Sequence, residues 1–157
     1  TTTVPAGSKS IGKTQWRKNI VEIAAAHRIP YAAQAAVHQI LDLYKKAEKG
    51  FNANGPSFLA VLQPCTTNWS FDPSLTMKYS RLAVETNFWP LYEIEDGKVH
   101  INFKPRERKP IEEFLKGQTR FKHLFKPENK YVITEMQKMI DEEWDRLLKL
   151  EESGVKL

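Results

Sequence analysis

The pattern of hydrophobic and polar positions predicts a helix, a strand, a second helix and a second strand in the first part of the chain. The first helix is expected in TQWRKNIVEIAAAHR (14–28), where five residues share one helical face: Trp16, Ile20, Ile23, Ala24 and His27. The run YAAQAAV (31–37) is short, small and apolar, which predicts a closely packed buried strand. Helical spacing then returns in QILDLYKKAEKG (39–50), through Ile40, Leu43, Tyr44 and Ala47, and Gly50 is the expected stop.

The next apolar run, PSFLAVLQP (56–64), has the length of a strand and no alternation with polar residues. Such a run is typical of a parallel strand that is covered on both faces. Because helices and strands alternate up to this point, we expect an α/β fold with a parallel sheet. Two parallel strands make a thin sheet, so we expect a neighbouring segment to complete it.

The pattern changes after residue 72. We expect a helix in 72–87 that begins at Asp72 as its N-cap, and a β-hairpin in 89–103 around Asp96-Gly97. A short helix is expected to follow Pro110. The last predicted helix, within 130–152, has apolar residues at helical spacing: Val132, Ile133, Met136, Ile140, Trp144 and Leu147. We therefore divide the chain into an α/β part, residues 1–72, and an extension of helices and a hairpin, residues 73–157.

The size of the chain, 157 residues, fits one domain with a hydrophobic core. Its apolar runs are shorter than the roughly 18 residues that span a bilayer, so we do not expect a membrane protein. The opening residues lack the apolar centre of a secretory signal. A single cysteine cannot form an internal disulfide, which favours a reducing compartment such as the cytoplasm.

Basic residues outnumber acidic ones, 24 Lys and Arg to 19 Asp and Glu, and the formal net charge is +5. This balance favours an acidic partner, which can be a nucleic acid, an acidic protein or a phosphorylated ligand. The densest basic run is KPRERKP (104–110), and the simpler interpretation of it is a solvated surface.

The common phosphate-binding and zinc-binding motifs are absent from the sequence, and its four histidines lack the spacing of metal ligands. The aromatic residues Phe88, Trp89 and Tyr92 are interpreted as core, because they are not interleaved with basic residues as in a base-stacking surface. The catalytic residues, if the chain has any, are not recognisable from these patterns.

Cys65 follows the predicted strand 56–64, at the end where open α/β sheets place ligand-contacting residues. A nucleophilic cysteine needs a nearby base, and neither a neighbouring histidine nor a nucleophile motif is present. Two interpretations stay open on the residues alone. Cys65 is either an inert core cysteine or one ligand of a metal or cluster whose other ligands come from elsewhere.

Several segments resemble the carboxyl-terminal part of the beta subunit of pyruvate:ferredoxin oxidoreductase and its 2-oxoacid relatives. The most specific are the Pro-Cys element followed by a tryptophan, RLAVETNFWPLYEIEDGK (81–98) and RKPIEEFLKGQTRFKHL (108–124). The opening TTTVPAG, the segment IVEIAAAHRIPY (20–31) and the last helix resemble the same subunit, so the similarity covers nearly the whole chain.

The resemblance implies a subunit that binds thiamine diphosphate, Mg²⁺ and one 4Fe–4S cluster, within a parallel-sheet fold. The implied reaction is the coenzyme A-dependent oxidative decarboxylation of a 2-oxoacid, with electrons passed through the cluster to ferredoxin. Cys65 matches the last cluster ligand of that family. The resemblance also places Thr66, Thr67 and Asn68 beside the cluster, where we expect them to hydrogen-bond its sulfurs.

Most of the cofactor-binding apparatus of that family has no match in this sequence. The other three cysteines and the Gly-Asp-Gly element that holds Mg²⁺ and the diphosphate are missing, and we expect them upstream of the segment that this chain represents. This chain is then expected to supply at most one cluster ligand. The strand 31–37 is expected to pack beneath the thiamine site.

Two short segments depart from the family pattern. Val37-His38-Gln39-Ile40 stands where relatives have a sequence like Val-Gly-Tyr-Pro, and Cys65-Thr66-Thr67-Asn68-Trp69 stands where they often have Cys-Pro-Thr-Gly-Trp. The first departure indicates a possible change of substrate. Pyruvate is the expected 2-oxoacid, and oxalate, a branched-chain or an aryl 2-oxoacid are the alternatives.

The implied partners are the other subunits of the complex, ferredoxin, the 2-oxoacid and coenzyme A, with neither a nucleic acid nor a membrane. An acidic ferredoxin or a sister subunit fits the basic surface of the chain. The alternative is a non-catalytic module that uses this surface for binding or subunit interaction, and its binding to a nucleic acid would weaken steeply with salt.

Overall fold

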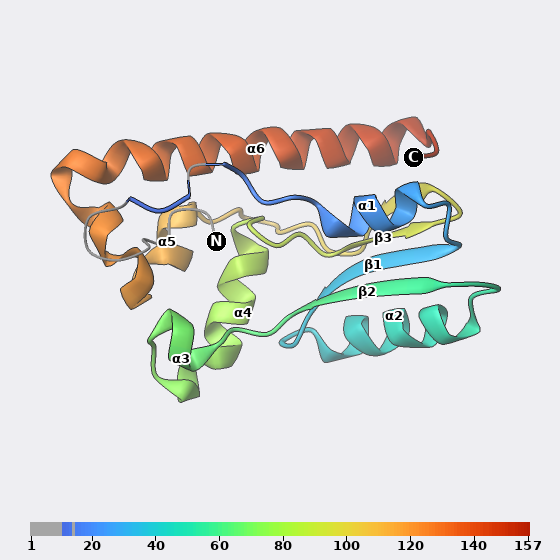
Figure 1. The fold of residues 1–157 in the computed structure, drawn as a ribbon, viewed down its shortest axis with the longest axis horizontal. Helices are drawn as coiled ribbons and strands as arrows, with labels where there is room; N and C mark the ends of the chain where they lie inside the picture. Colours follow the sequence, from blue (N-terminus) through green and yellow to red (C-terminus); the bar gives the residue numbers. More distant parts are fainter. Residues whose placement is uncertain (1–10, 14) are drawn as a thin grey trace.

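The computed structural model describes residues 11–13 and 15–157, and its centre is a four-stranded sheet (Figure 1). The strands are β1 (Tyr31–Ala36), β2 (Ser57–Leu62), β3 (Tyr92–Glu95) and β4 (Lys98–Ile101), in the order β2-β1-β3-β4. β1 and β2 are parallel, whereas β3 is antiparallel to both β1 and β4. The fold is therefore α/β, as predicted, with one parallel pair continued by a hairpin in a mixed sheet.

Helices cover both faces of the sheet. They are α1 (Ile20–Ala26), α2 (Ile40–Asn52), α3 (Thr66–Trp69), α4 (Thr76–Glu85), α5 (Ile111–Leu115) and α6 (Lys130–Ser153), with 3₁₀ segments at Pro73–Leu75, Thr119–Phe125 and Pro127–Asn129. α2 packs on one face, against β1 and β2. α1 and the last part of α6 pack on the other, where Val21, Ala25 and Leu147 are buried with sheet residues such as Ile94.

A second hydrophobic core lies beside the sheet, and its buried residues come from helices. It joins α3, α4, α5, the segment Thr119–Phe125 and the first half of α6 through Trp69, Tyr79, Leu82, Ala83, Ile111, Phe114, Leu115, Phe121, Leu124, Val132, Met136 and Ile140. The long helix α6 thus spans both cores, and the apolar spacing predicted for it is confirmed by the burial of these residues.

The first predicted helix was placed too early and on the wrong face. α1 begins at Ile20, because the side chain of Asn19 accepts a hydrogen bond from the Glu22 backbone N–H at 3.3 Å and caps the helix there. Ile20 and Ile23 are 48% and 43% exposed, and the buried face consists of Val21 and Ala25 instead.

The expected stop of α2 was wrong, because α2 passes Gly50 and ends at Asn52. β2 has α2 on one face and α1 on the other, as expected for a covered strand. It nevertheless forms an edge of the sheet, and its Val61 is 42% exposed. An edge strand has a strand neighbour on one side only, which an apolar run in the sequence does not reveal.

The prediction of a hairpin at Asp96-Gly97 is confirmed. These two residues connect β3 to β4 with φ angles of 49° and 82°, the positive values that a type I′ turn requires. Asp72 is an N-cap as predicted, but of the 3₁₀ segment Pro73–Leu75 that precedes α4, where its carboxylate accepts a hydrogen bond from the Ser74 N–H at 2.8 Å. The division of the chain at residue 72 stays a prediction, and the pairing of β1 with β3 crosses it.

Candidate functional site

Cys65 lies just beyond the carboxyl end of β2, as its place in the sequence predicted. It is the N-cap of the short helix α3, and its Sγ accepts a hydrogen bond from the Asn68 N–H at 3.4 Å. The thiol is exposed rather than buried in the core. An exposed sulfur at a strand end is accessible to a ligand, so the interpretation as an inert core cysteine loses its main support.

The residues predicted beside Cys65 form the helix α3 itself. Thr67 and Asn68 are exposed and Thr66 is partly buried. The backbone of this turn is tied together locally, since the Thr67 carbonyl accepts from Ser70 Oγ at 3.1 Å and the Trp69 N–H donates to the Cys65 carbonyl at 3.0 Å. The chain therefore holds Cys65 and these three residues together in one turn, open to solvent.

Trp69 anchors this turn in the second hydrophobic core. Its ring is 9% exposed and meets Phe114 edge-on, with the ring centroids 5.8 Å apart. The Phe71 ring lies 6.1 Å from it. Because a buried tryptophan four residues after Cys65 fixes the end of α3, the thiol is presented from a firm base rather than from a free loop.

Arg120 completes the surroundings of α3, and sequence reasoning missed it. Its guanidinium lies 3.9 Å from the centre of the Trp69 ring and 4.4 Å from that of Phe121. Its Nε donates to Gln118 Oε1 at 2.9 Å, while the neighbouring Thr119 Oγ1 donates to the Ser70 carbonyl at 3.0 Å.

Burial has the largest effect on the charge of Arg120, because it lowers the pKa of the guanidinium to about 10. The interaction with Cys65 opposes that shift in pKa, so the two side chains lie close enough to interact. In the sequence, the only sign that Arg120 belongs to the site was its position inside the segment 108–124, which carries part of the resemblance.

A largely apolar cavity of about 250 Å³ lies beside α3. It is lined by Trp16, Arg17, Leu62, Trp69, Phe88, Trp89, Arg120, Phe121 and Met136. Arg17 lies among aromatic rings on its wall, 4.6 Å from the centre of Phe88 and 4.9 Å from that of Trp89. Tyr92 is fully buried, and Phe88 and Trp89 are partly buried. All three aromatic residues therefore belong to the packed interior.

His38 lies at the same edge of the sheet as Cys65, because β1 and β2 are parallel and both end there. Its Nδ1 lies 3.0 Å from Ser80 Oγ on α4, and burial followed by the nearby Arg81 lowers its pKa. His38 is therefore held as a neutral hydrogen-bonding group between β1 and α4.

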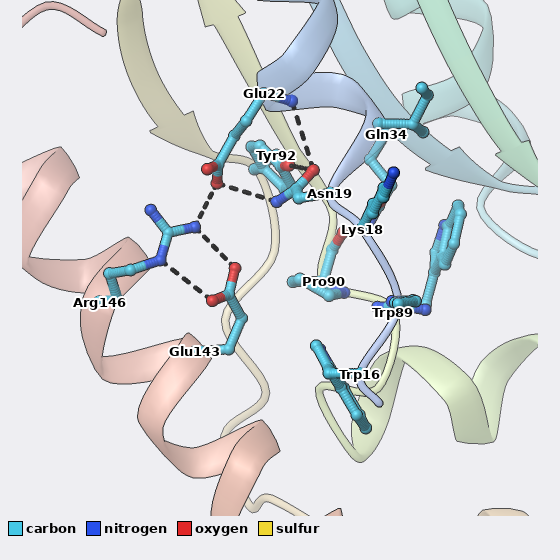
Figure 2. A pocket seen from close by; sticks show the side chains of 12 residues that line it. Trp16, Lys18, Asn19, Glu22, Gln34, Trp89, Pro90, Tyr92, Glu143 and Arg146 are labelled. Carbon is cyan, nitrogen blue, oxygen red and sulfur yellow. Dashed lines mark hydrogen bonds and ion pairs between the residues drawn. The ribbon is translucent and has the colours of Figure 1, made fainter. Parts of the chain in front are cut away.

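A second cavity, of about 320 Å³, lies between α1, α6 and the sheet (Figure 2). Its charged side chains bind one another: Arg146 donates to Glu143 at 2.7 Å and also bonds to Glu22. Asn19 accepts from the Tyr92 hydroxyl at 2.8 Å. The hydrogen bonds that Arg146 donates to Glu143 and Glu22 raise the pKa of its guanidinium. This network connects α1 to α6, so its role is to hold the fold together.

The donor groups near Cys65 fit one corner of an iron–sulfur cluster and no complete metal site. Within residues 11–13 and 15–157, no group of three or more His, Cys, Asp and Glu side chains is placed to hold a metal ion. A 4Fe–4S cluster needs four thiolates, and Cys65 is the one cysteine in the sequence. An exposed thiol at a strand end suits a cluster shared with another segment.

Comparison with known proteins identifies relatives along nearly the whole chain. It is 50% identical over 153 residues to the pyruvate synthase subunit PorB of Thermotoga maritima, which is 97% of this chain and 47% of that protein. It is 47% identical over 142 residues to PorB of Methanocaldococcus jannaschii, 90% of this chain and 46% of that protein. This chain is a homologue of the PorB and VorB subunits.

The chain is also 43% identical, over 154 residues, to the ketoisovalerate oxidoreductase subunit VorB of Pyrococcus abyssi. That match covers 97% of this chain and 48% of that protein. The chain therefore spans about half the length of the curated relatives it matches. No protein-family model matches it. Among the described residues of this PorB/VorB homologue, no helix is both long and apolar enough to cross a bilayer.

Proposed function

We propose that this chain forms part of the beta subunit of a 2-oxoacid:ferredoxin oxidoreductase, and that Cys65 is one thiolate ligand of its 4Fe–4S cluster. The observation that carries the proposal is the 50% identity to a pyruvate synthase subunit over 97% of the chain. The exposed thiol beyond the end of β2 supports the role given to Cys65, because a ligand at this edge is open to a second segment that brings the other thiolates.

In the complete enzyme, thiamine diphosphate with Mg²⁺ supplies carbanion chemistry and the cluster supplies one-electron transfer. The residues of this chain then have supporting roles. Trp69 fixes α3, and the small residues of β1 allow close packing at the sheet edge that carries His38 and Cys65. The proposed partners are the remaining part of the subunit, its sister subunits, ferredoxin, coenzyme A and the 2-oxoacid.

Thr66, Thr67 and Asn68 are proposed to hydrogen-bond the cluster sulfurs, which raises the reduction potential. The exposure of Thr67 and Asn68 supports this role, because their side chains are available to an outside group. Thr67→Val removes the hydroxyl with little change of shape. The variant should show a more negative cluster midpoint, and an unchanged midpoint would contradict the role of Thr67.

Pyruvate is the proposed substrate, since the most similar relatives named above are pyruvate synthase subunits. The test uses the complete enzyme containing this chain, with coenzyme A and an electron-accepting dye, and compares pyruvate with 2-ketoisovalerate. We expect dye reduction that needs coenzyme A and is faster with pyruvate. No reduction with either 2-oxoacid, in an enzyme that holds its cofactors, would overturn the proposed activity.

A further inference from the structure

Arg120 is a cation without a counter-ion. No carboxylate lies within ion-pair distance of its guanidinium in the part of the chain that the structure describes. Residues 1–10 and Thr14 include no Asp or Glu, so they bring no such partner either. Among the described residues, the ring contacts and the hydrogen bond of the guanidinium are with neutral groups, namely the Trp69 and Phe121 rings and the Gln118 side-chain oxygen.

An unpaired cation in a partly buried position is costly, because burial removes hydration that no neighbouring anion replaces. The cost is visible as the lowered pKa of Arg120, and the stacking of its guanidinium on Trp69 places the cation beside the turn that Cys65 caps. The arrangement therefore lacks negative charge on the side of Cys65. A group that brings negative charge to Cys65 would complete it.

We propose that Arg120 is the electrostatic partner of the cluster bound at Cys65, and that its positive charge makes that cluster easier to reduce. The inference rests on the proposed function. A 4Fe–4S centre with four thiolates is an anion, and reduction adds one more negative charge. A fixed cation nearby stabilises the reduced form more than the oxidised form, so it raises the midpoint potential.

The contacts of Arg120 hold its charge in place. Stacking on Trp69 joins the guanidinium to α3, whose first turn is capped by Cys65. The hydrogen bond from Thr119 Oγ1 to the Ser70 carbonyl, 3.0 Å long, joins the segment next to Arg120 to the backbone at the end of α3. Since both segments are fixed in the second hydrophobic core, the distance between the cation and Cys65 is set by packing and not by a flexible side chain.

Arg17 offers a matched control on the wall of the same cavity. It also lies among aromatic rings, burial lowers its pKa to about 10, and it donates to the Phe88 carbonyl. The acidic groups that act on it are Tyr92 and Glu143 rather than Cys65. Arg17→Gln thus removes a buried cation from the same cavity without removing the one that stacks on Trp69 beside Cys65.

The experiment is a redox titration of the cluster in the complete enzyme, followed by electron paramagnetic resonance, with iron measured in each sample. Four variants are compared with the wild type: Arg120→Gln, Arg120→Met, Arg120→Lys and Arg17→Gln. Arg120→Met keeps an aliphatic side chain on Trp69 and serves where Arg120→Gln does not assemble. Arg120→Lys keeps the charge.

We expect the neutral variants of Arg120 to lower the ratio of reduced to oxidised cluster about tenfold at a fixed ambient potential, which is about 59 mV for one electron. Arg120→Lys and Arg17→Gln should titrate close to the wild type. Full iron with an unshifted midpoint in a neutral Arg120 variant overturns the inference alone. A wild-type enzyme without cluster iron overturns the proposed function instead.

Discussion

At the scale of single residues, the most constrained carboxylate in the chain is Glu93, on the face of the sheet that α2 covers. It is 4% exposed and accepts hydrogen bonds from the Tyr31 hydroxyl at 2.6 Å and from Lys49 Nζ at 2.8 Å. Burial alone would raise its pKa, but the bonds from Lys49 and Tyr31 outweigh burial and lower it. Glu93 is therefore ionised in the folded protein and connects β3 to β1 and α2.

This lowered pKa gives the isolated chain a pH-dependent stability. The ionised carboxylate contributes fully above its ordinary pKa of 4.5, and the contribution is lost as the pH falls through the lower folded value. Glu93→Gln should lower the free energy of unfolding by about 1–3 kcal/mol at neutral pH. The loss should shrink in acid. Urea unfolding followed by tryptophan fluorescence at neutral pH and at about pH 3 measures both values.

Glu95 provides the comparison for that prediction. It also pairs with Lys49, at 3.1 Å, but its side chain is 58% exposed. Glu95→Gln should therefore change the free energy of unfolding by no more than about 1 kcal/mol. A difference between wild type and Glu93→Gln that is the same at both pH values would show that ionisation of Glu93 does not contribute.

At the scale of elements, the turn after α5 determines where Arg120 lies. Gly117 has a φ angle of +87°, and a Cβ atom added there would lie 2.5 Å from the Tyr79 hydroxyl oxygen on α4. That hydroxyl donates to the Lys116 carbonyl at 3.3 Å. Close approach of α4 to this turn thus depends on the absence of a side chain at Gly117.

We expect Gly117→Ala to destabilise the protein by about 1–3 kcal/mol, from the positive φ angle and from the contact with Tyr79. Tyr79→Phe removes the oxygen that the new methyl group meets. The double variant should therefore be more stable than Gly117→Ala alone, although Tyr79→Phe by itself removes a hydrogen bond. Thermal or urea unfolding of the four proteins measures this coupling, and strictly additive losses would contradict it.

The elements that sequence reasoning predicted best are those whose signals are local. Asp96 and Gly97 carry the hairpin turn in their own backbone preferences, and Asp72 caps the helix next to it. The boundary of α1 was missed because Asn19, in the middle of a helical pattern, caps the helix with its side chain. The position of β2 at an edge depends on which strands meet, and that is a property of the whole fold.

The candidate site likewise combines a local sequence signal with a contact that depends on the whole fold. Cys65 was singled out because it is a single cysteine at the end of a predicted strand, and the resemblance then favoured a cluster ligand over a core cysteine. Arg120 lies 55 residues further along the chain and reaches α3 only through the packing of the second hydrophobic core, so no spacing rule connects the two. Its stacking on Trp69 had to be observed in the structure.

At the scale of the whole molecule, α2 and the strand β2 beside it expose apolar side chains. On α2, Ile40 is 65% exposed, Leu41 75% and Tyr44 66%, and Val61 on the edge strand β2 is 42% exposed. Monomeric proteins rarely leave such residues clustered in solvent, and an open strand edge invites pairing. The chain matches about half of each relative named above, which supports an interface on this side in the complete subunit.

The isolated chain should therefore self-associate at micromolar concentrations. Leu41→Lys combined with Tyr44→Lys should shift it toward the monomer in sedimentation velocity, because two charges are placed on the apolar helix face. Tyr131→Lys is the control, since Tyr131 is 55% exposed on α6, away from α2. Equal association of the double variant and the wild type would show that this surface is not the site of contact.

The most direct test of the account is the iron and acid-labile sulfide content of the complete enzyme with Cys65→Ser. We expect the wild type to hold one 4Fe–4S cluster, of about four irons, that depends on this subunit, and the variant to lose it while its subunits still assemble. Trp69→Phe, which keeps the thiol and an aromatic anchor, should retain the iron. A full complement of iron and sulfide in assembled Cys65→Ser would show that Cys65 is not a cluster ligand.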